Sequence, residues 1–300
     1  MSRSRTTDTT AAGLESMAAQ ALPRKSPGFV RRLARNPPAV AGVVVICLAV
    51  FVAIFAPFVS PYTPTAQHTD DILQAPSGRF LLGTDDLGRD TLTRIIFGAR
   101  VSLMVGVIAV AIGLVLGSVL GLIAGYLYGL VDSVIMRVMD GLLAFPALVL
   151  ALAITAMLGP SLVNVMIAIG VTGIPSYARL VRGQVLALRG LDYVVAARSL
   201  GQRPTKIVVA HILPNTIAPI IVQTSISIPG AILAEAGLSF LGLGVQPPTP
   251  SWGAMINTAQ GYMLRDPWVV IAPGVAIFVT VLAFNFLGDA LRDALDPRLR

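Results

Sequence analysis

The chain has 300 residues, of which 55% are hydrophobic and only 12% are charged, and its formal net charge is +7. A water-soluble protein of this size could not cover so much apolar surface, so the composition predicts an all-α integral membrane protein. The positive charge does not indicate nucleic-acid binding, because the cations flank apolar runs instead of forming a basic patch with interleaved aromatic side chains. The single cysteine, Cys47, excludes an intrachain disulfide and a cysteine-based metal site.

Six apolar stretches follow a polar N-terminal segment. Residues 1–38 are rich in Ser, Thr, Ala and Arg and are predicted to form a disordered, basic cytoplasmic tail. A first transmembrane helix is predicted at 39–59, and an extracytoplasmic segment with five aspartates at 60–99. A five-helix core is predicted at 100–300, with spans at about 100–126, 133–158, 162–181, 212–240 and 267–287.

The distribution of cations predicts the orientation of these six helices. With the N-terminus in the cytoplasm, sixteen of the 22 Lys and Arg side chains fall in cytoplasmic segments and five fall outside. Both termini are therefore predicted to be cytoplasmic. The polar stretch that interrupts the apolar sequence at about 189–211 is predicted to lie on the same side.

This polar stretch contains the start and stop signals of two short helices. Asp192 suits a helix N-cap, and the helix is expected to end near Leu200. Gly201 suits the left-handed position that ends a helix, and Pro204 suits the first turn of the next one. The stretch is predicted to be a structured loop that stands out of the membrane, with Pro214 at the entry to the fifth span.

The same stretch resembles the EAA loop of ATP-binding-cassette (ABC) importer permeases. That family pattern is Glu-Ala-Ala, three residues, Gly, nine residues, Ile, one residue, Leu-Pro. Here Ala196-Ala197, Gly201 and Leu213-Pro214 match, whereas Val195 stands at the Glu position and His211 at the Ile position.

Three other segments indicate a particular subfamily. They are LLGTDDLGRDTLTRIIFGARVSL (81–103), AEAGLSFLGLGVQPPTPSWGAMI (234–256) and FNFLGDALRDALDPRLR (284–300). They are similar to the dipeptide/oligopeptide permease subunits of the C type. The resemblance covers nearly everything after residue 30 and implies a type I ABC importer permease fold, with six helices, both termini inside, in the bacterial inner membrane.

The resemblance also implies partners and site residues. In that family the loop is a coupling helix, which docks in a cleft of a cytoplasmic ABC ATPase. A second, related permease subunit, an extracytoplasmic solute-binding protein and a peptide substrate would complete the system. ATP and Mg²⁺ would bind the ATPase, with no cofactor in this chain. The implied coupling residues are Val195, Ala196, Ala197, Arg198, Gly201, Arg203, Lys206, Leu213 and Pro214.

The residues themselves agree that the nucleotide binds elsewhere. A P-loop requires Gly-x-x-x-x-Gly-Lys-Ser/Thr, and neither lysine of this chain, Lys25 or Lys206, has that context. Without the acidic residue of the family at position 195, the loop is expected to dock by apolar contact there. Arg198, Arg203 and Lys206 are then the expected polar contacts.

Three ionisable residues within predicted spans are candidates for an intramembrane or path function. Arg137 and Asp140 are three residues apart and are expected to pair near the cytoplasmic end of the third span. Glu235 is expected near the outer end of the fifth span, where water reaches it. A structural pair or interface contact is favoured over a proton relay for all three. Prolines that interrupt the spans predict kinks at Pro146, Pro175, Pro219 and Pro229.

The function implied is therefore an ATP-driven importer of dipeptides or oligopeptides, in which this non-catalytic chain forms half of the translocation path. The few charges in the spans predict a weakly selective path lined by Ser, Thr, Asn and backbone groups. A permease for nickel or another small solute remains an alternative. An ion-coupled secondary transporter would show inverted repeats and broken helices around charged residues, which the sequence does not display. A membrane-embedded enzyme is disfavoured, because neither His-Glu-x-x-His nor Gly-x-Ser-x-Gly occurs.

Overall fold

The computed structural model describes residues 36–295, and every regular element within that range is a helix. Residues 1–35 of the predicted tail, and residues 296–300, lie outside the described residues. The long helices are α3 (Pro37–Ile54), α5 (Thr91–Leu127), α8 (Leu162–Leu188), α11 (Leu213–Phe240) and α13 (Trp268–Leu295). The shorter elements are α4 (Ala56–Val59), η1 (Thr69–Asp71), α6 (Leu130–Leu143), α7 (Ala147–Leu158), α9 (Asp192–Ser199), α10 (Pro204–Ile207), the π-helical turn η2 (Val208–Ile212), α12 (Trp252–Ala259) and η3 (Gln260–Tyr262).

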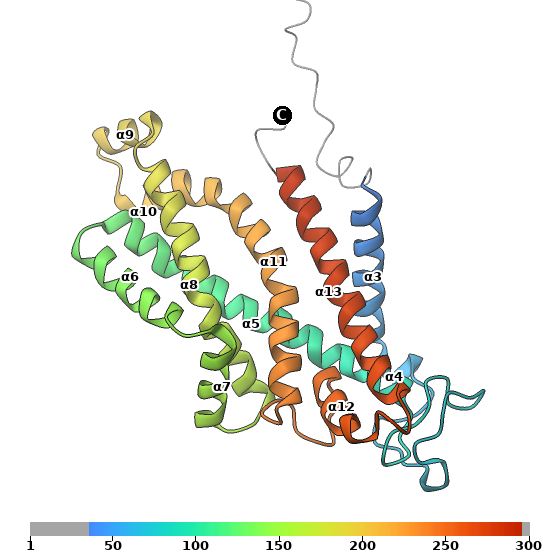
Figure 1. Cartoon of the computed structure of the whole chain (residues 1–300). Helices are drawn as coiled ribbons and strands as arrows, with labels where there is room; N and C mark the ends of the chain where they lie inside the picture. The colour runs from blue at the N-terminus through green and yellow to red at the C-terminus, as the bar shows by residue number, and fades with distance from the viewer. Residues whose placement is uncertain (1–35, 296–300) are drawn as a thin grey trace, which may run out of the picture.

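The arrangement of these helices is that of a membrane-spanning bundle. In the described residues five helices are long and apolar enough to cross a membrane, and α6 with α7 makes a sixth if the pair counts as one bent span. The predicted all-α architecture with six spans is confirmed. Figure 1 shows the start of α3, the end of α13 and the α9–α10 loop at one end of the bundle, with α7, α12 and the segment between α4 and α5 at the other. The two ends of the described chain thus lie on the same side as the polar loop.

The third span differs from the prediction of one helix at 133–158. It consists of α6 and α7, which are bent by 90° at a short break. Pro146 stands immediately before α7, with φ −55° and ψ 129°. A proline cannot donate a backbone hydrogen bond and keeps its preceding residue out of the helical region, so one continuous helix cannot pass through this point. The kink predicted at Pro146 is confirmed, and no charged residue lies at the break, residues 144–146.

Two features at the end of the bundle opposite the α9–α10 loop extend beyond the predicted elements. Helix α5 begins nine residues before the predicted start at 100, because the Asp90 carboxylate caps it by accepting a hydrogen bond of 2.7 Å from the Thr93 N–H. Helix α12 was not predicted. Ser251 caps it through a hydrogen bond of 3.2 Å from the Ala254 N–H, and Trp252 at its start is buried.

At the end that carries the polar loop, the second short helix of the loop is continuous with the fifth span. Residues Pro204–Phe240 form one helical segment, in which the π-helical turn η2 precedes α11. Pro214 follows directly on η2 in the first turn of α11 and has no N–H to donate back to the preceding turn. A wider π turn accommodates such a defect without ending the helix.

The most extensive helix contact joins α5 to α8, and glycines on α5 make it possible. Gly113, Gly117, Gly121 and Gly125 recur every four residues and form a stripe on the face of α5 that meets α8. A Cβ atom at Gly117 would lie 2.5 Å from the Ile174 carbonyl oxygen, and one at Gly121 would lie 2.5 Å from that of Ala178. The two backbones are therefore in direct contact over three helical turns, which is the packing that small residues permit between membrane helices.

Candidate functional site

The polar loop is anchored to the bundle by the inner face of α9 and by α10. Val194 and Ala197 of α9 are buried against Val181 and Val185 of α8. Ile207 and Ile212 belong to the same buried cluster, together with side chains of α5 and α11. The spacing of Val194 and Ala197, three apart, places them on one helix face. The loop is thus packed firmly on the helices that it joins.

The opposite face of the loop is exposed and mixes apolar and basic side chains. Of the residues predicted to couple to an ATPase, seven are exposed: Val195, Ala196, Arg198, Gly201, Arg203, Lys206 and Pro214. Leu213 is half-buried, and Ala197 is buried in the anchoring cluster. Leu200, 82% exposed, was missed, although an apolar residue at the end of a polar loop helix was a usable signal.

The turn between α9 and α10 has the predicted glycine geometry. Gly201 has φ +76°, and its N–H donates to the Arg198 carbonyl at 3.0 Å. The left-handed conformation at this position favours glycine over residues with a Cβ atom. Asp192 does not cap α9, because the N-cap is Leu191 and Asp192 occupies the first turn, where its charge faces the positive end of the helix dipole.

A side-chain contact joins the two arms of the loop. The Nε2 atom of His211 lies 3.2 Å from Oε1 of Gln202, and the His211 ring packs edge-on against Tyr193 with centroids 6.2 Å apart. His211, which replaces the family's isoleucine, therefore makes packing and hydrogen-bonding contacts between α9 and η2.

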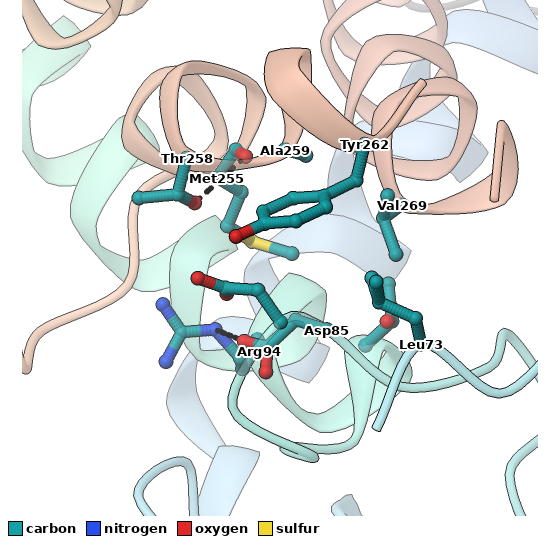
Figure 2. Close-up of a pocket in the computed structure, with 10 residues that line it drawn as sticks. Leu73, Asp85, Arg94, Met255, Thr258, Ala259, Tyr262 and Val269 are labelled. Atoms are coloured by element: carbon teal, nitrogen blue, oxygen red, sulfur yellow. Dashed lines mark hydrogen bonds and ion pairs between the residues drawn. The ribbon is translucent and has the colours of Figure 1, made fainter. Parts of the chain in front are cut away.

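The segment before α5, within residues 60–90, is a folded unit held by ion pairs. Arg89 Nε donates to Asp85 Oδ2 at 2.7 Å, and Arg94 Nε lies 3.4 Å from the same oxygen. Figure 2 shows Tyr262 and Met255, from the α12–η3 region, facing Asp85 and Arg94 across a small pocket. Partial burial, with the neighbouring Asp85 carboxylate as the next cause, raises the pKa of Asp86 above its ordinary value. These charges pair with one another, and Arg89 and Arg94 are buried.

An intramembrane cavity of about 260 Å³ lies between α5, α7, α8 and α11. Ala109, Val110 and Gly113 of α5 and Ala147 of α7 form its apolar walls, together with small residues of α8 and α11. The hydrogen-bonding side chains in the lining are Thr172, Ser176, Tyr177 and Ser227. No acidic or basic side chain is among the lining residues. The cavity therefore offers neutral donors and acceptors and no fixed charge.

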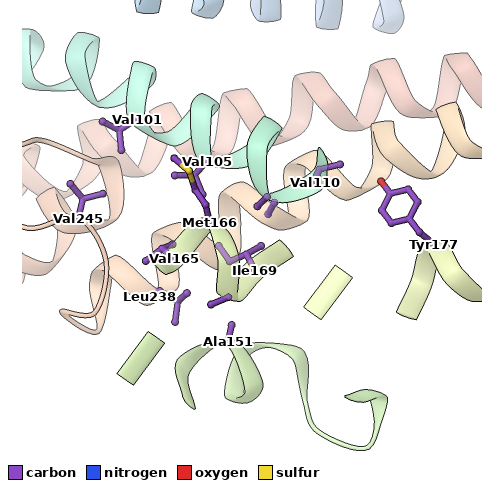
Figure 3. Packing of buried hydrophobic residues seen from close by; sticks show 13 residues of the cluster. Val101, Val105, Val110, Ala151, Val165, Met166, Ile169, Tyr177, Leu238 and Val245 are labelled. Carbon is purple, nitrogen blue, oxygen red and sulfur yellow. The ribbon is translucent and has the colours of Figure 1, made fainter. Parts of the chain in front are cut away.

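Tyr177 connects this cavity to the apolar core. Its ring belongs to the largest buried cluster, with Val105, Val165 and Leu238. Figure 3 shows Tyr177 at one end of that cluster, apart from the other labelled residues. Its hydroxyl donates to Thr224 Oγ1 of α11 at 3.2 Å.

None of the three predicted intramembrane candidates lines this cavity. Asp140 pairs with Arg179 of α8, at 2.6 Å between Nη2 and Oδ1, and not with Arg137 as expected. Helix α6 lies against α8, so the tertiary contact supplies a cation with better geometry than the one on the same helix. Arg137 is exposed.

Glu235 was expected within reach of water, but its side chain is completely buried between α5 and α11. It accepts hydrogen bonds from Ser102 at 3.1 Å and from Ser239 at 2.7 Å. The burial follows from its place on the inward face of α11, next to Ile232 and Leu238, which are also buried. Through its hydrogen bond with Ser102, Glu235 thus links α11 to α5.

A second ion pair between α6 and α8 was not predicted. Arg182 donates to the Asp132 carboxylate through both Nε and Nη2, the latter at 2.7 Å. Asp132 is buried, so this paired geometry also offsets the unfavourable removal of its charge from water. With Asp140–Arg179, it holds α6 against α8 on the inner side of the break in the third span.

A bundle of bent membrane helices, with an anchored polar loop at one end and a neutral cavity within, defines a polytopic membrane permease. Residues 117–300 match the family described as binding-protein-dependent transport system inner membrane component, and residues 28–76 match the N-terminal transmembrane domain of oligopeptide transport permease C. The chain belongs to this family of inner-membrane transport components. It is a permease subunit of the ABC importer type and is not itself an enzyme.

Curated relatives are similar over most of their length. The di/tripeptide transport system permease protein DppC of Pseudomonas aeruginosa is 49% identical over 278 residues, which cover 91% of this chain and 92% of that protein. The dipeptide transport system permease protein DppC of Alkalihalophilus pseudofirmus is 45% identical, over 90% of this chain and 89% of that protein. The glutathione transport system permease protein GsiD of Pectobacterium atrosepticum is 46% identical, over 91% of each chain. The predicted resemblance to C-type permease subunits is confirmed.

A solved structure shares the fold. The crystal structure of an amino acid ABC transporter with histidines has a TM-score of 0.53 and 20% sequence identity, and the match covers 67% of this chain and 94% of that chain. At this identity the likeness concerns the helical architecture alone.

Proposed function

We propose that this chain is the transmembrane subunit of an ATP-driven importer of dipeptides or oligopeptides and forms half of its translocation path. The observation that carries the proposal is the cavity, whose lining provides hydroxyl groups and small apolar side chains without a fixed charge. Peptides share their backbone donors and acceptors whatever their side chains, so neutral hydrogen-bonding groups suit a varied peptide cargo. The substrates in the names of these relatives, di/tripeptides, dipeptides and glutathione, are all peptides.

The exposed face of the α9–α10 loop is the proposed contact with a cytoplasmic ATPase, which binds ATP and Mg²⁺. Val195 and Leu200 provide apolar contact, and Arg198, Arg203 and Lys206 surround them with positive charge. This division follows from exposure, because Val194 and Ala197 on the other face are occupied by packing within the chain.

The packing offers a route by which movement of the loop reaches the cavity. Val194 and Ala197 press directly on Val181 and Val185 of α8. Helix α8 is in turn in backbone contact with α5 along the glycine stripe. Both helices line the cavity. Displacement of α9 by a partner should therefore move α5 and α8 together instead of bending the loop alone.

Three further components complete the proposed system. A second, related permease would line the other half of the path, and a solute-binding protein would deliver the peptide at the end of the bundle that carries α12 and the segment at 60–99. The tail at 1–38 and the loop at about 189–211 are assigned to the cytoplasm. Asp140 and Glu235 are proposed to hold neighbouring helices through their observed partners.

The alternatives are less well supported by the site. A nickel path would favour imidazole or carboxylate ligands, and the cavity lining contains neither. An ion-coupled transporter would place charged groups around the broken helix near the path, whereas residues 144–146 are Ala, Phe and Pro.

Uptake in cells with and without this chain tests the proposal. Labelled dipeptides and oligopeptides, and separately nickel, are offered to a deletion strain and to the same strain carrying the gene. The expected result is loss of peptide accumulation in the deletion strain and its restoration by the gene, with nickel accumulation unchanged. Loss of nickel accumulation with normal peptide uptake would overturn the peptide assignment.

A further inference from the structure

The cavity ends on its loop-facing side at one side chain, Tyr177. On α8 the lining residues run from Ile169 to Tyr177, and Tyr177 is the one nearest to α9 in the chain. On α11, which runs in the opposite direction, the lining runs from Ser227 to Ala234, so Ser227 is nearest to the loop. Thr224 lies one helical turn beyond Ser227, toward the cytoplasmic end. The Tyr177–Thr224 hydrogen bond therefore crosses from α8 to α11 just on the loop-facing side of the cavity.

This hydrogen bond is geometrically complete. Tyr177 donates to Thr224 Oγ1 at 3.2 Å, and the Thr224 hydroxyl passes its own hydrogen to the Ile220 carbonyl at 2.8 Å. The Tyr177 side chain is only 1% exposed. Among residues 36–295 it is the one side-chain hydrogen bond that joins α8 to α11.

On the loop-facing side of this bond, α8 is packed against the loop, while a separate apolar cavity of about 340 Å³, lined in part by Ile220 and Thr224, lies between α5, α11 and α13. Val181 and Val185, one and two turns further along α8, are completely buried, and Ile220 of α11 packs against the same cluster. That cluster includes Val194 and Ala197 of the loop. The side chains that close the loop-facing side of the cavity and those that anchor the loop therefore belong to one packed cluster.

We propose that the Tyr177–Thr224 pair is a latch that closes this chain's half of the path on the cytoplasmic side. The proposal rests on the proposed function, because it takes the cavity to be part of that path. Opening toward the cytoplasm must separate α8 from α11 and break this bond. Both hydroxyls then face the path, where each can form a hydrogen bond with the amide of a passing peptide. When the latch separates, each hydroxyl therefore exchanges its partner on the other helix for a neutral group of the peptide.

The barrier can be tested without any substrate. In the assembled complex, Cys47 is replaced by Ser, and a single cysteine is introduced by Ser227→Cys. Ser227 lines the cavity next to the Tyr177–Thr224 pair. A membrane-impermeant thiol reagent is applied to the cytoplasmic face in inverted vesicles without nucleotide. Tyr177→Phe and Thr224→Val each remove one hydroxyl and keep the shape of the side chain. Because a net hydrogen bond shifts such an equilibrium by about two- to tenfold, each should raise the labelling rate by that factor.

Three comparisons decide the outcome. The Tyr177→Phe/Thr224→Val double variant should label no faster than either single variant, because both remove the same bond. Thr224→Ser, which keeps the hydroxyl, should label at the original rate. Thr172→Val is the matched control, since the Thr172 hydroxyl lines the cavity but donates to the Ile169 carbonyl of its own helix.

Unchanged labelling in both single variants, or additive effects in the double variant, would overturn the latch. These results do not depend on what the cavity carries. If the labelling pattern is as expected but peptide uptake is independent of this chain, the proposed substrate fails and the latch stands.

Discussion

Replacement of Gly117 by alanine should loosen the contact between α5 and α8. The new Cβ atom would lie 2.5 Å from the Ile174 carbonyl oxygen and 2.6 Å from the Tyr177 Cβ atom. Backbone and Cβ atoms cannot rotate away, so the helices must separate by about 1 Å to restore ordinary contact. Such overpacking costs about 1–3 kcal/mol, whereas the better helix propensity of alanine returns at most about 1 kcal/mol. The net expectation is a loss of about 0–2 kcal/mol in the free energy of unfolding, which is about 1–3 kcal/mol relative to a glycine-to-alanine change that meets no neighbour.

Gly141 of α6 provides the matched control. A Cβ atom there would have no neighbour within 4 Å, so Gly141→Ala should be neutral or slightly stabilising. The free energy of unfolding of the purified chain in mixed micelles, measured by denaturing-detergent titration, compares the two variants directly. If Gly117→Ala is as stable as Gly141→Ala, α5 and α8 are not in the close contact described, and the rigid link between loop and cavity fails with it.

Three other tests concern the loop and the ion pairs. Gly201→Val should strain the turn by roughly 1 kcal/mol or more and reduce co-purification of the ATPase without removing the chain from the membrane; normal co-purification and transport would contradict a need for φ +76°. Val195→Asp should impair transport more than Val195→Ala, because it puts a charge into an apolar contact; equal effects would argue against apolar docking. Asp132→Asn should destabilise the chain by about 1–3 kcal/mol, because it leaves the Arg182 charge without its buried partner. Asp140 belongs to an ion pair whose side chains are about half exposed, so Asp140→Asn should lower the free energy of unfolding by less than about 1 kcal/mol. A larger loss for Asp140→Asn than for Asp132→Asn would refute the argument that burial makes the Asp132 pair the more important one.

Much of the architecture follows from signals that are local in the chain. The length and hydropathy of each apolar run predict the spans, because a bilayer demands helices about 20 residues long whatever their neighbours. The glycine conformation at Gly201 and the helix start at Pro204 are equally local, since a missing Cβ or N–H restricts the backbone at that residue alone. The exposed face of the loop was therefore largely predictable, apart from Leu200.

Other features depend on which helices become neighbours. Asp140 could have paired with Arg137 on its own helix, but packing of α6 against α8 brings Arg179 to it. Glu235 is buried because Ser102, 133 residues earlier in the chain, meets it across the α5–α11 contact.

The cavity itself has the same origin. Its lining comes from four helices, and no local pattern distinguishes Thr172 or Ser227 from other polar residues in spans. The sequence alone determined the transmembrane elements and the turn chemistry of the loop, because these rest on backbone preferences and on transfer from water to lipid. Only the tertiary structure decided the partners of the buried charges and the place of the cavity, because both depend on side chains that the chain brings together over long separations.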